Sequence, residues 1–248
     1  MTELPKALLI DLDDTIIDDS GCVDGCWADA CAEAAGRVPG LDATVLQKAI
    51  QSYASVWWGD PVNHQRGRLD LRVATREIVE EALRKLERDV SLGREIAERY
   101  RDIREERAAL IDGAVETLEW LRSRSVRLGM MTNGAGAAQR AKIERFELEA
   151  HFEHILIEGE FGCGKPDPRV FTTLLDALGA KPKEAWAIGD NLQADVFGAM
   201  DLGIYGIWVD SSGQRVPDGD ERRTQPRNRE PDRIVASICE LRIGVRHG

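Results

Sequence analysis

The sequence predicts an α/β protein with a doubly wound, mostly parallel sheet and an inserted α-helical cap domain. Short apolar runs alternate with amphipathic segments, a pattern typical of strands that helices cover on both faces of a sheet. Polar and acidic residues directly follow several of these runs, at the sheet edge where open α/β proteins bind ligands. A long stretch of helical periodicity separates the first run from the next.

Length and composition narrow the possible functions. The 248 residues are 43% hydrophobic, enough for a sizeable core in one domain or in a domain with an insertion. The formal net charge of −11 argues against nucleic acid or a membrane surface as partner. Neither a signal-peptide pattern nor an apolar run of about 18 residues is present, so a cytoplasmic protein is expected. The five cysteines match neither a disulfide framework nor a four-ligand zinc pattern.

The apolar run 7–10 predicts the first strand, and Asp-Leu-Asp-Asp-Thr at 11–15 follows it directly. A carboxylate in this place can attack phosphorus to form an acyl phosphate, and a second one nearby can carry the proton for the leaving group. Asp11 and Asp13 therefore indicate phosphoryl-transfer chemistry. Considered alone, the pair is also compatible with a helix cap or an Asx turn.

Residues 21–108 form the predicted cap, because strands are few and apolar residues recur at helical spacing. Two stripes carry this periodicity: Leu46, Ala49, Ile50, Tyr53 and Trp57, and Leu71, Ile78, Val79, Ala82, Leu83 and Leu86. We expect residues 57–68 to form a loop-like connection between helices. It collects aromatic and basic side chains: Trp57, Trp58, His64, Arg66 and Arg68. These side chains either contact a substrate or form an exposed rim.

The second core strand is predicted at 126–131 and ends in Thr132, Asn133 and Gly134. A hydroxyl, an amide and an unshielded backbone N–H suit phosphate oxygens. The same three residues also occur at ordinary strand-end turns, so the motif alone leaves both interpretations open.

A helix at about 137–146 and a strand at 155–157 follow, which leaves no room for a second cap before Lys165. Lys165 comes after flexible glycines and before two prolines, and it is a point charge near the start of a predicted helix. Apolar residues at helical spacing define that helix: Val170, Phe171, Leu174, Leu175 and Leu178. A single Lys-Pro pair can equally belong to an ordinary loop.

The apolar run 185–188 predicts another strand, which leads into Asp190 and Asn191. Asp195 lies about one helical turn beyond Asn191, so Asp190 and Asp195 add two carboxylates to the same edge of the sheet. For this segment alone, the alternative is a helix cap, since a predicted helix that ends near Gly203 follows.

Residues 204–209 predict the last strand of the sheet. The stretch 211–232 is rich in Gly, Pro, Arg and acidic residues without apolar periodicity, so we expect a solvated loop. A final helix is predicted from apolar residues at helical spacing: Ile234, Val235, Ile238 and Leu241.

The acidic residues after the strands predict a metal site. Asp11, Asp13 and Asp190 would repel one another by about 1 to 4 kcal/mol per pair if the fold brought them within a few ångströms. A divalent cation would relieve this repulsion. Mg²⁺ is the expected ion, because it takes oxygen ligands, keeps several waters and shares its coordination with substrate phosphate.

The order of the motifs, Asp-x-Asp-x-Thr, Thr-Asn-Gly, Lys-Pro and Gly-Asp-x-x-x-x-Asp, resembles the haloacid dehalogenase superfamily of phosphohydrolases. The resemblance covers the chain from about residue 6 to residue 209. It implies a Rossmann-like catalytic core of residues 1–20 and 109–248 with the cap, residues 21–108, inserted after the first motif. In this superfamily such a cap closes over the catalytic loops, which would make residues 15–21 a flexible gate.

The resemblance also implies roles for the acidic residues. Asp11 would be the nucleophile and a metal ligand. Asp13 would be the general acid/base and would offer its backbone carbonyl to the metal. Asp190 would be a Mg²⁺ ligand, and Asp195 would support the metal or its waters.

For the remaining motif residues the resemblance implies contact with the phosphate. Thr132, Asn133 and Gly134 would hold its oxygens. Lys165 would bridge the nucleophile and the phosphate as a catalytic and binding cation.

We therefore expect a Mg²⁺-dependent phosphatase that hydrolyses a small phosphorylated metabolite through an aspartyl-phosphate on Asp11. A sugar phosphomutase shares the same core residues, and a non-catalytic metal- or phosphate-binding module is a further alternative. A dehalogenase or a phosphonatase is disfavoured, because either would be expected to lack the acid at Asp13. The cap sequence carries no readable code for the metabolite, and both a monomer and a homodimer are compatible with the chain.

Overall fold

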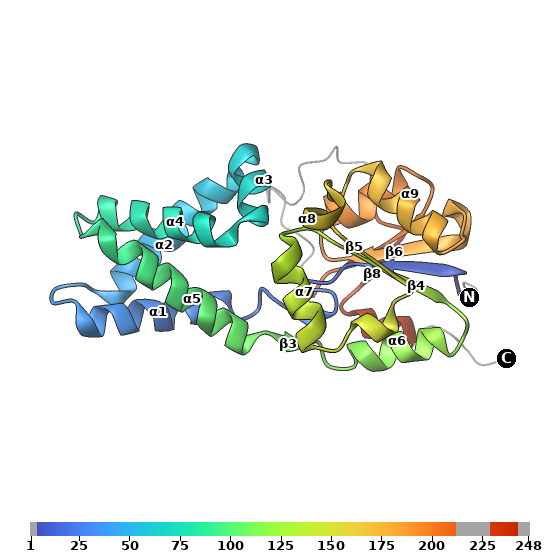
Figure 1. Ribbon diagram of the computed structural model, residues 1–248, viewed down its shortest axis with the longest axis horizontal. Helices are drawn as coiled ribbons and strands as arrows, with labels where there is room; N and C mark the ends of the chain where they lie inside the picture. The colour runs from blue at the N-terminus through green and yellow to red at the C-terminus, as the bar shows by residue number, and fades with distance from the viewer. Residues whose placement is uncertain (1–3, 212–228, 243–248) are drawn as a thin grey trace. The chain divides into compact units, whose positions relative to one another are not determined.

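The computed structural model describes residues 4–211 and 229–242. Contacts within the chain divide it into two compact units. The core unit comprises the described residues of Met1–Asp18 and Leu110–Gly248, and the cap unit comprises Asp19–Ala109. The helices of the cap unit run in colour from blue to green in Figure 1.

Six strands of the described residues form one sheet in the order β5-β4-β1-β6-β7-β8, and each neighbouring pair is parallel. Their bounds are β1 (Ala7–Ile10), β4 (Arg127–Thr132), β5 (His154–Ile157), β6 (Ala185–Gly189), β7 (Tyr205–Val209) and β8 (Arg233–Val235). All four residues of the interior strand β1 are buried, as its unbroken apolar sequence predicts. The predicted parallel α/β sheet is confirmed.

The described residues of the core unit also form helices. The longer ones are α6 (Ala114–Arg122), α7 (Gly136–Arg145) and α9 (Pro168–Ala177). Shorter segments are α8 (Glu158–Phe161), α10 (Gly198–Met200), η2 (Glu149–His151), η3 (Pro182–Glu184), η4 (Leu192–Phe197) and η6 (Ile238–Arg242).

The two faces of the sheet are covered by different helices, because neighbouring side chains of a strand point to opposite faces. Leu8 of β1 belongs to the hydrophobic cluster that includes Leu118 of α6. Leu9 belongs to the opposite cluster, which includes Phe171 of α9. Figure 1 accordingly shows α9 above the sheet and α6 below it. The fold is therefore doubly wound.

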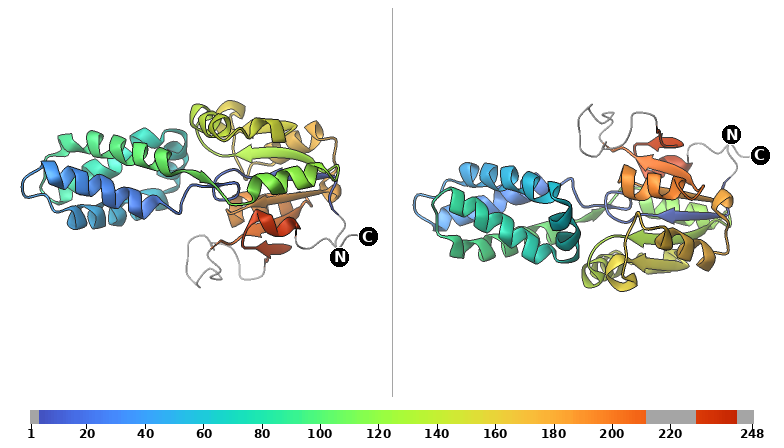
Figure 2. Two further views of the ribbon diagram at one scale, coloured as in Figure 1. Left: turned by 90° about the horizontal axis from the view of Figure 1, so that it is seen from below. Right: turned by 90° about the horizontal axis from the view of Figure 1, so that it is seen from above.

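The cap unit is helical and has its own hydrophobic core. Its elements are α1 (Val23–Arg37), α2 (Ala43–Gly59), α3 (Pro61–Leu69), α4 (Leu71–Lys85), η1 (Val90–Leu92) and α5 (Gly93–Arg107), and Figure 2 shows its long helices side by side. Trp27 of α1 stacks on Tyr100 of α5 with ring centroids 3.6 Å apart. Two short strands, β2 (Ile17–Asp18) and β3 (Ala109–Leu110), pair in a separate two-stranded sheet.

The expected loop at 57–68 is wrong, because α2 continues to Gly59 and α3 covers most of the remainder. Asp60 supplies the reason: its carboxylate accepts hydrogen bonds from the backbone nitrogens of Val62 and Asn63 at 3.0 and 2.9 Å. Pro61 occupies the first turn, where its missing N–H costs nothing. A Gly-Asp-Pro sequence that indicates a break thus also starts a helix.

The expected final helix is also wrong in part. Residues 233–235 form the edge strand β8, and only a 3₁₀ helix, η6, follows. Ile234 is exposed, whereas Val235 and Ile238 are buried, a pattern that suits a strand paired with β7 on one side. Most of the expected loop at 211–232 lies outside the described residues. No helix among the described residues is long and apolar enough to cross a membrane.

Gly129 on β4 tests how tightly the sheet packs. A Cβ atom at Gly129 would lie 2.8 Å from Leu174 and 2.9 Å from Leu178. Gly129→Ala is therefore expected to lower the free energy of unfolding by about 1–3 kcal/mol, measured by urea denaturation. In the control Gly36→Ala, the new Cβ meets no atom within 4 Å on α1, and a gain of about 0.5–1 kcal/mol is expected. Equal effects of the two substitutions would contradict this account of the packing.

Candidate active site

The site lies at the carboxyl ends of three neighbouring strands. Asp11 follows β1, Thr132 ends β4 and Asp190 follows β6. Because β4, β1 and β6 are adjacent and parallel, their carboxyl ends meet at one edge of the sheet. The loop between α8 and α9 adds Lys165 to this edge.

Lys165 is the central cation of the site. Its side chain is 3% exposed, and its Nζ lies 2.5 Å from Oδ1 of Asp11 and 2.6 Å from Oδ1 of Asp195. Burial disfavours the charged ammonium, but the attraction of the two carboxylates outweighs burial and raises the pKa of Lys165. Lys165 is therefore a fixed positive charge between two acids.

Three carboxylates meet around this lysine. Oxygens of Asp11, Asp190 and Asp195 all lie within 4.8 Å of one another. Burial, and then repulsion by Asp195 and Asp190, raise the pKa of Asp11 well above its usual range, although Lys165 opposes this shift. Burial, and then repulsion by Asp195 and Asp14, raise the pKa of Asp190 to about 7.

This donor set fits a divalent cation. When ionised, the three acids exceed the single lysine in charge, in a largely buried space. The donors are all oxygens, which hard cations such as Mg²⁺ prefer over softer metals. A bound cation would offset the repulsion that raises the pKa values of Asp11 and Asp190.

Gly189 makes room for the carboxylate of Asp195. A Cβ atom at Gly189 would lie 2.2 Å from Oδ2 of Asp195, so a side chain at this position would displace it. The same Oδ2 accepts a hydrogen bond from the backbone nitrogen of Asn191 at 3.0 Å. The segment that follows starts as a π-helical turn, η4, rather than as the expected regular helix. Sequence reasoning found Asp195 but missed the requirement for glycine at 189.

Two of the residues expected to hold phosphate have internal partners. Oδ1 of Asn133 accepts a hydrogen bond from the backbone nitrogen of Lys165 at 2.7 Å, and Nδ2 of Asn133 donates to the backbone carbonyl of Lys165 at 2.9 Å. The N–H of Gly134, expected to be unshielded, donates to Oε2 of Glu158 at 2.9 Å. Glu158 is 7% exposed and needs such donors. Asn133 thus fixes the loop that carries Lys165, and Thr132 is buried beside it.

The carboxylate of Asp13 makes its contacts with α7. Its Oδ1 lies 2.6 Å from Nζ of Lys142, and its Oδ2 lies 2.8 Å from Nε2 of Gln139. Sequence reasoning missed both partners, although their i, i+3 spacing places them on one face of the helix.

Two of the aromatic and basic residues at 57–68, Trp57 and Arg66, have partners within the cap unit. Arg66 forms a two-fold hydrogen-bonded ion pair with Glu77, and its guanidinium lies 5.0 Å from the centroid of the Trp57 ring. Trp57 is buried and donates to Glu77 at 3.3 Å. Arg66 and Trp57 thus stabilise the cap internally.

Comparison with known proteins places this geometry in a family. The model of haloacid dehalogenase-like hydrolases matches residues 5–203. Phosphoserine phosphatase of Thermus thermophilus is 35% identical over 231 residues, which cover 83% of this chain and 88% of that protein. Glyceraldehyde 3-phosphate phosphatase of Pyrococcus furiosus is 38% identical over 98 residues, 40% of this chain and 41% of that protein. The Bacillus subtilis HAD-hydrolase YfnB, bound to magnesium, has a TM-score of 0.71 at 20% identity, covering 96% of this chain and 97% of that chain.

The raised pKa of Asp190 predicts how stability depends on pH. The pKa of an unfolded Asp is about 3.9, whereas burial and nearby acids raise the pKa of folded Asp190 to about 7, so between these values the folded state binds more protons. The free energy of unfolding contributed by this group therefore decreases as pH rises from about 4 to about 7. In EDTA, Asp190→Asn is expected to lose less stability than wild type between pH 5 and pH 7.5, measured by urea denaturation. Asp176→Asn, which changes an exposed acid on α9, should follow wild type. Identical pH dependences in Asp190→Asn and wild type would refute this expectation.

Proposed function

Since this chain belongs to the haloacid dehalogenase-like hydrolase family, we propose that it hydrolyses the phosphoric monoester of a small metabolite through an aspartyl-phosphate on Asp11. Its phosphatase relatives support phosphoric monoesters as the substrate class. The observation that carries the proposed mechanism is the buried contact of Lys165 with Asp11, next to Asp190 and Asp195. A carboxylate that faces a fixed cation at a sheet edge suits attack on a phosphate drawn to the same cation.

Mg²⁺ is the proposed cofactor. When bound, it would be held by the carboxylates of Asp11 and Asp190 and the backbone carbonyl of Asp13, with Asp195 in support, and it would offset the charges of carboxylates and phosphate oxygens. The all-oxygen donor set and the raised pKa values of Asp11 and Asp190 support this ion.

In the first step, a carboxylate oxygen of Asp11 forms a bond to phosphorus while the bond from phosphorus to the leaving-group oxygen breaks. Asp13 gives its proton to that oxygen as it departs. Lys165 offsets the charge on the phosphoryl oxygens, and Thr132 offers its hydroxyl to them.

In the second step, water attacks phosphorus and the bond between phosphorus and Asp11 breaks. Asp13 takes the proton that the water loses, so both carboxyl groups return to their starting states and inorganic phosphate leaves.

The substrate proposed for this site is a small phosphorylated metabolite. The two relatives named above are phosphatases of phosphoserine and of glyceraldehyde 3-phosphate. Their names support a small organic monoester, rather than a macromolecule, as the substrate of this chain. A phosphomutase would return the phosphoryl group to a bound sugar. Hydrolysis is proposed instead, because the relatives named above are phosphatases.

A panel of phosphate-release assays tests the reaction. O-phosphoserine, glyceraldehyde 3-phosphate, uridine 5′-monophosphate and 4-nitrophenyl phosphate are incubated with the protein in Mg²⁺ or in EDTA. We expect release in Mg²⁺ only, and a loss on the order of 10³-fold or more in Asp11→Asn. Asp176→Asn should retain wild-type rates. Isomerised sugar phosphates with little free phosphate would favour the mutase, and full activity in Asp11→Asn would exclude the mechanism.

Thermal unfolding tests the metal without an activity assay. Mg²⁺ binds the folded state, so a concentration of 100 times Kd should stabilise it by about 2.7 kcal/mol and raise Tm at pH 7.5. Asp190→Asn should reduce or abolish this increase in Tm, because it removes one charged ligand. An increase as large in the variant as in wild type would place the ion elsewhere.

A further inference from the structure

We propose that Lys142 and Gln139 are positioning residues for Asp13, each holding a different oxygen of its carboxylate. The inference rests on the proposed function, in which Asp13 moves the proton of the leaving group. All three residues belong to the core unit. Neither Lys142 nor Gln139 lies in the sequence motifs that identify the family.

The contacts that hold Asp13 are short and come from one helix. Nζ of Lys142 donates to Oδ1 at 2.6 Å, and Nε2 of Gln139 donates to Oδ2 at 2.8 Å. Lys142 and Gln139 are three residues apart on α7, so they lie on the same face of it. A carboxylate with a donor on each oxygen has a fixed position and a fixed rotation about its Cβ–Cγ bond.

Gln139 also ties Asp13 to the residue that ends β4. Its Nε2 lies 2.6 Å from Oγ1 of Thr132 and 3.0 Å from the carbonyl oxygen of Asn133. The carbonyl and the deprotonated carboxylate can only accept, so the nitrogen of the Gln139 amide must face them. The side chain of Gln139 is buried, which makes these bonds costly to break.

The side chain of Asp13 needs such support because the backbone turn that contains Asp13 does not fix the orientation of its carboxylate. It lies in a tight turn in which Asp14 has φ of 57° and donates to the carbonyl of Ile17 at 2.6 Å. The side chain of Asp13 is 27% exposed. Proton transfer requires one carboxyl oxygen within hydrogen-bond reach of one substrate atom, so free rotation would lower the fraction of productive complexes.

The two carboxylate oxygens of Asp13 have different roles in this arrangement, one in proton transfer and one in anchoring the side chain. When Oδ2 carries the proton, Gln139 can release it without leaving a buried donor unpaired, since Thr132 and Asn133 still accept from Nε2. Lys142 continues to hold Oδ1. We therefore infer that Oδ2 of Asp13 carries the transferred proton and that Oδ1 anchors the side chain.

The leaving group provides a test that separates positioning from general structural damage. An alkyl phosphate needs a proton on its departing oxygen, whereas 4-nitrophenolate departs with little protonation. The value of kcat/KM reports the steps up to that departure. We compare 4-nitrophenyl phosphate with whichever of O-phosphoserine, glyceraldehyde 3-phosphate and uridine 5′-monophosphate turns over fastest in wild type.

Lys142→Met and Gln139→Met are expected to lower kcat/KM for the alkyl phosphate by about 10- to 100-fold, with less than about a threefold loss for 4-nitrophenyl phosphate. KM for the alkyl phosphate should change by less than about twofold, because uniform binding of the substrate is unaffected. Lys142→Arg keeps the charge and a donor, so it should recover most of the lost rate. Circular dichroism and Tm report whether each variant is folded. If Lys142→Met does not fold, Gln139→Met alone provides the test.

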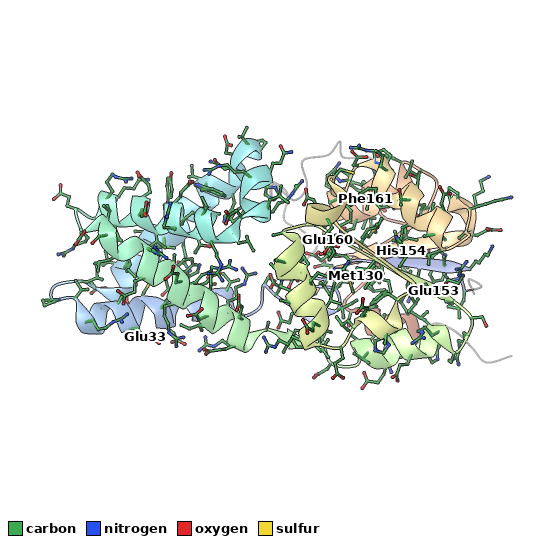
Figure 3. All side chains as sticks on the ribbon, in the orientation of Figure 1. Glu33, Met130, Glu153, His154, Glu160 and Phe161 are labelled. Atoms are coloured by element: carbon green, nitrogen blue, oxygen red, sulfur yellow. The ribbon has the colours of Figure 1, made fainter. Side chains whose placement is uncertain are left out.

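Arg140→Met is the matched control, because it removes a cation of the same helix that pairs with Glu160 of α8 at 2.7 Å rather than with Asp13. Glu160 is labelled beside α7 and α8 in Figure 3. This control should keep both substrates close to wild-type rates. Equal losses for both substrates in Lys142→Met and Gln139→Met, or wild-type rates in both variants, would overturn the inference alone. Absence of any wild-type turnover, or full turnover by Asp11→Asn, would overturn the proposed function and this inference with it.

Discussion

The burial of Lys165 between Asp11 and Asp195 is the interaction on which the rest of the site depends. A buried charge that loses its partner costs about 3–5 kcal/mol, so these three side chains must assemble together or not at all. Asn133 holds the backbone of Lys165 from both sides, and Gly189 gives the carboxylate of Asp195 its space. The loops around Lys165 thus meet one electrostatic requirement, the pairing of a buried ammonium. Because the site contains more acids than bases, a further cation would stabilise it.

A second network joins the ends of β1 and β4 through α7. Gln139 contacts both Asp13 and Thr132 with one nitrogen, and Lys142 contacts Asp13 from the next turn of the helix. The helix immediately after the Thr132 segment therefore sets the position of a side chain that follows a different strand. Such a link connects the proposed proton-transfer and phosphate-contact groups through the side chain of Gln139, and it gives a physical role to a helix that the motifs leave out.

Much of the architecture followed from local sequence. The apolar run at β1 predicted a buried parallel strand. The polar residues that follow the apolar runs were expected to lie close together, because parallel strands end at one edge of a sheet. That rule sufficed to group Asp11, Asp190 and Asp195, which the structure brings within 4.8 Å of one another. It sufficed because strand order is the only tertiary information that such an edge requires.

The tertiary structure decided which partner each polar group takes. Asp13 binds two residues more than a hundred positions away, and the N–H of Gly134 meets the buried Glu158 instead of solvent. Ile234 and Val235, which belong to a run of apolar residues at helical spacing, lie in a strand because the edge of β7 offers unpaired backbone groups. The sequence by itself therefore determined the interior strands and the chemistry at their ends, since periodicity and residue type are local properties. Packing alone determined the hydrogen-bond partners, because these depend on which side chains the folded chain brings within 3 Å.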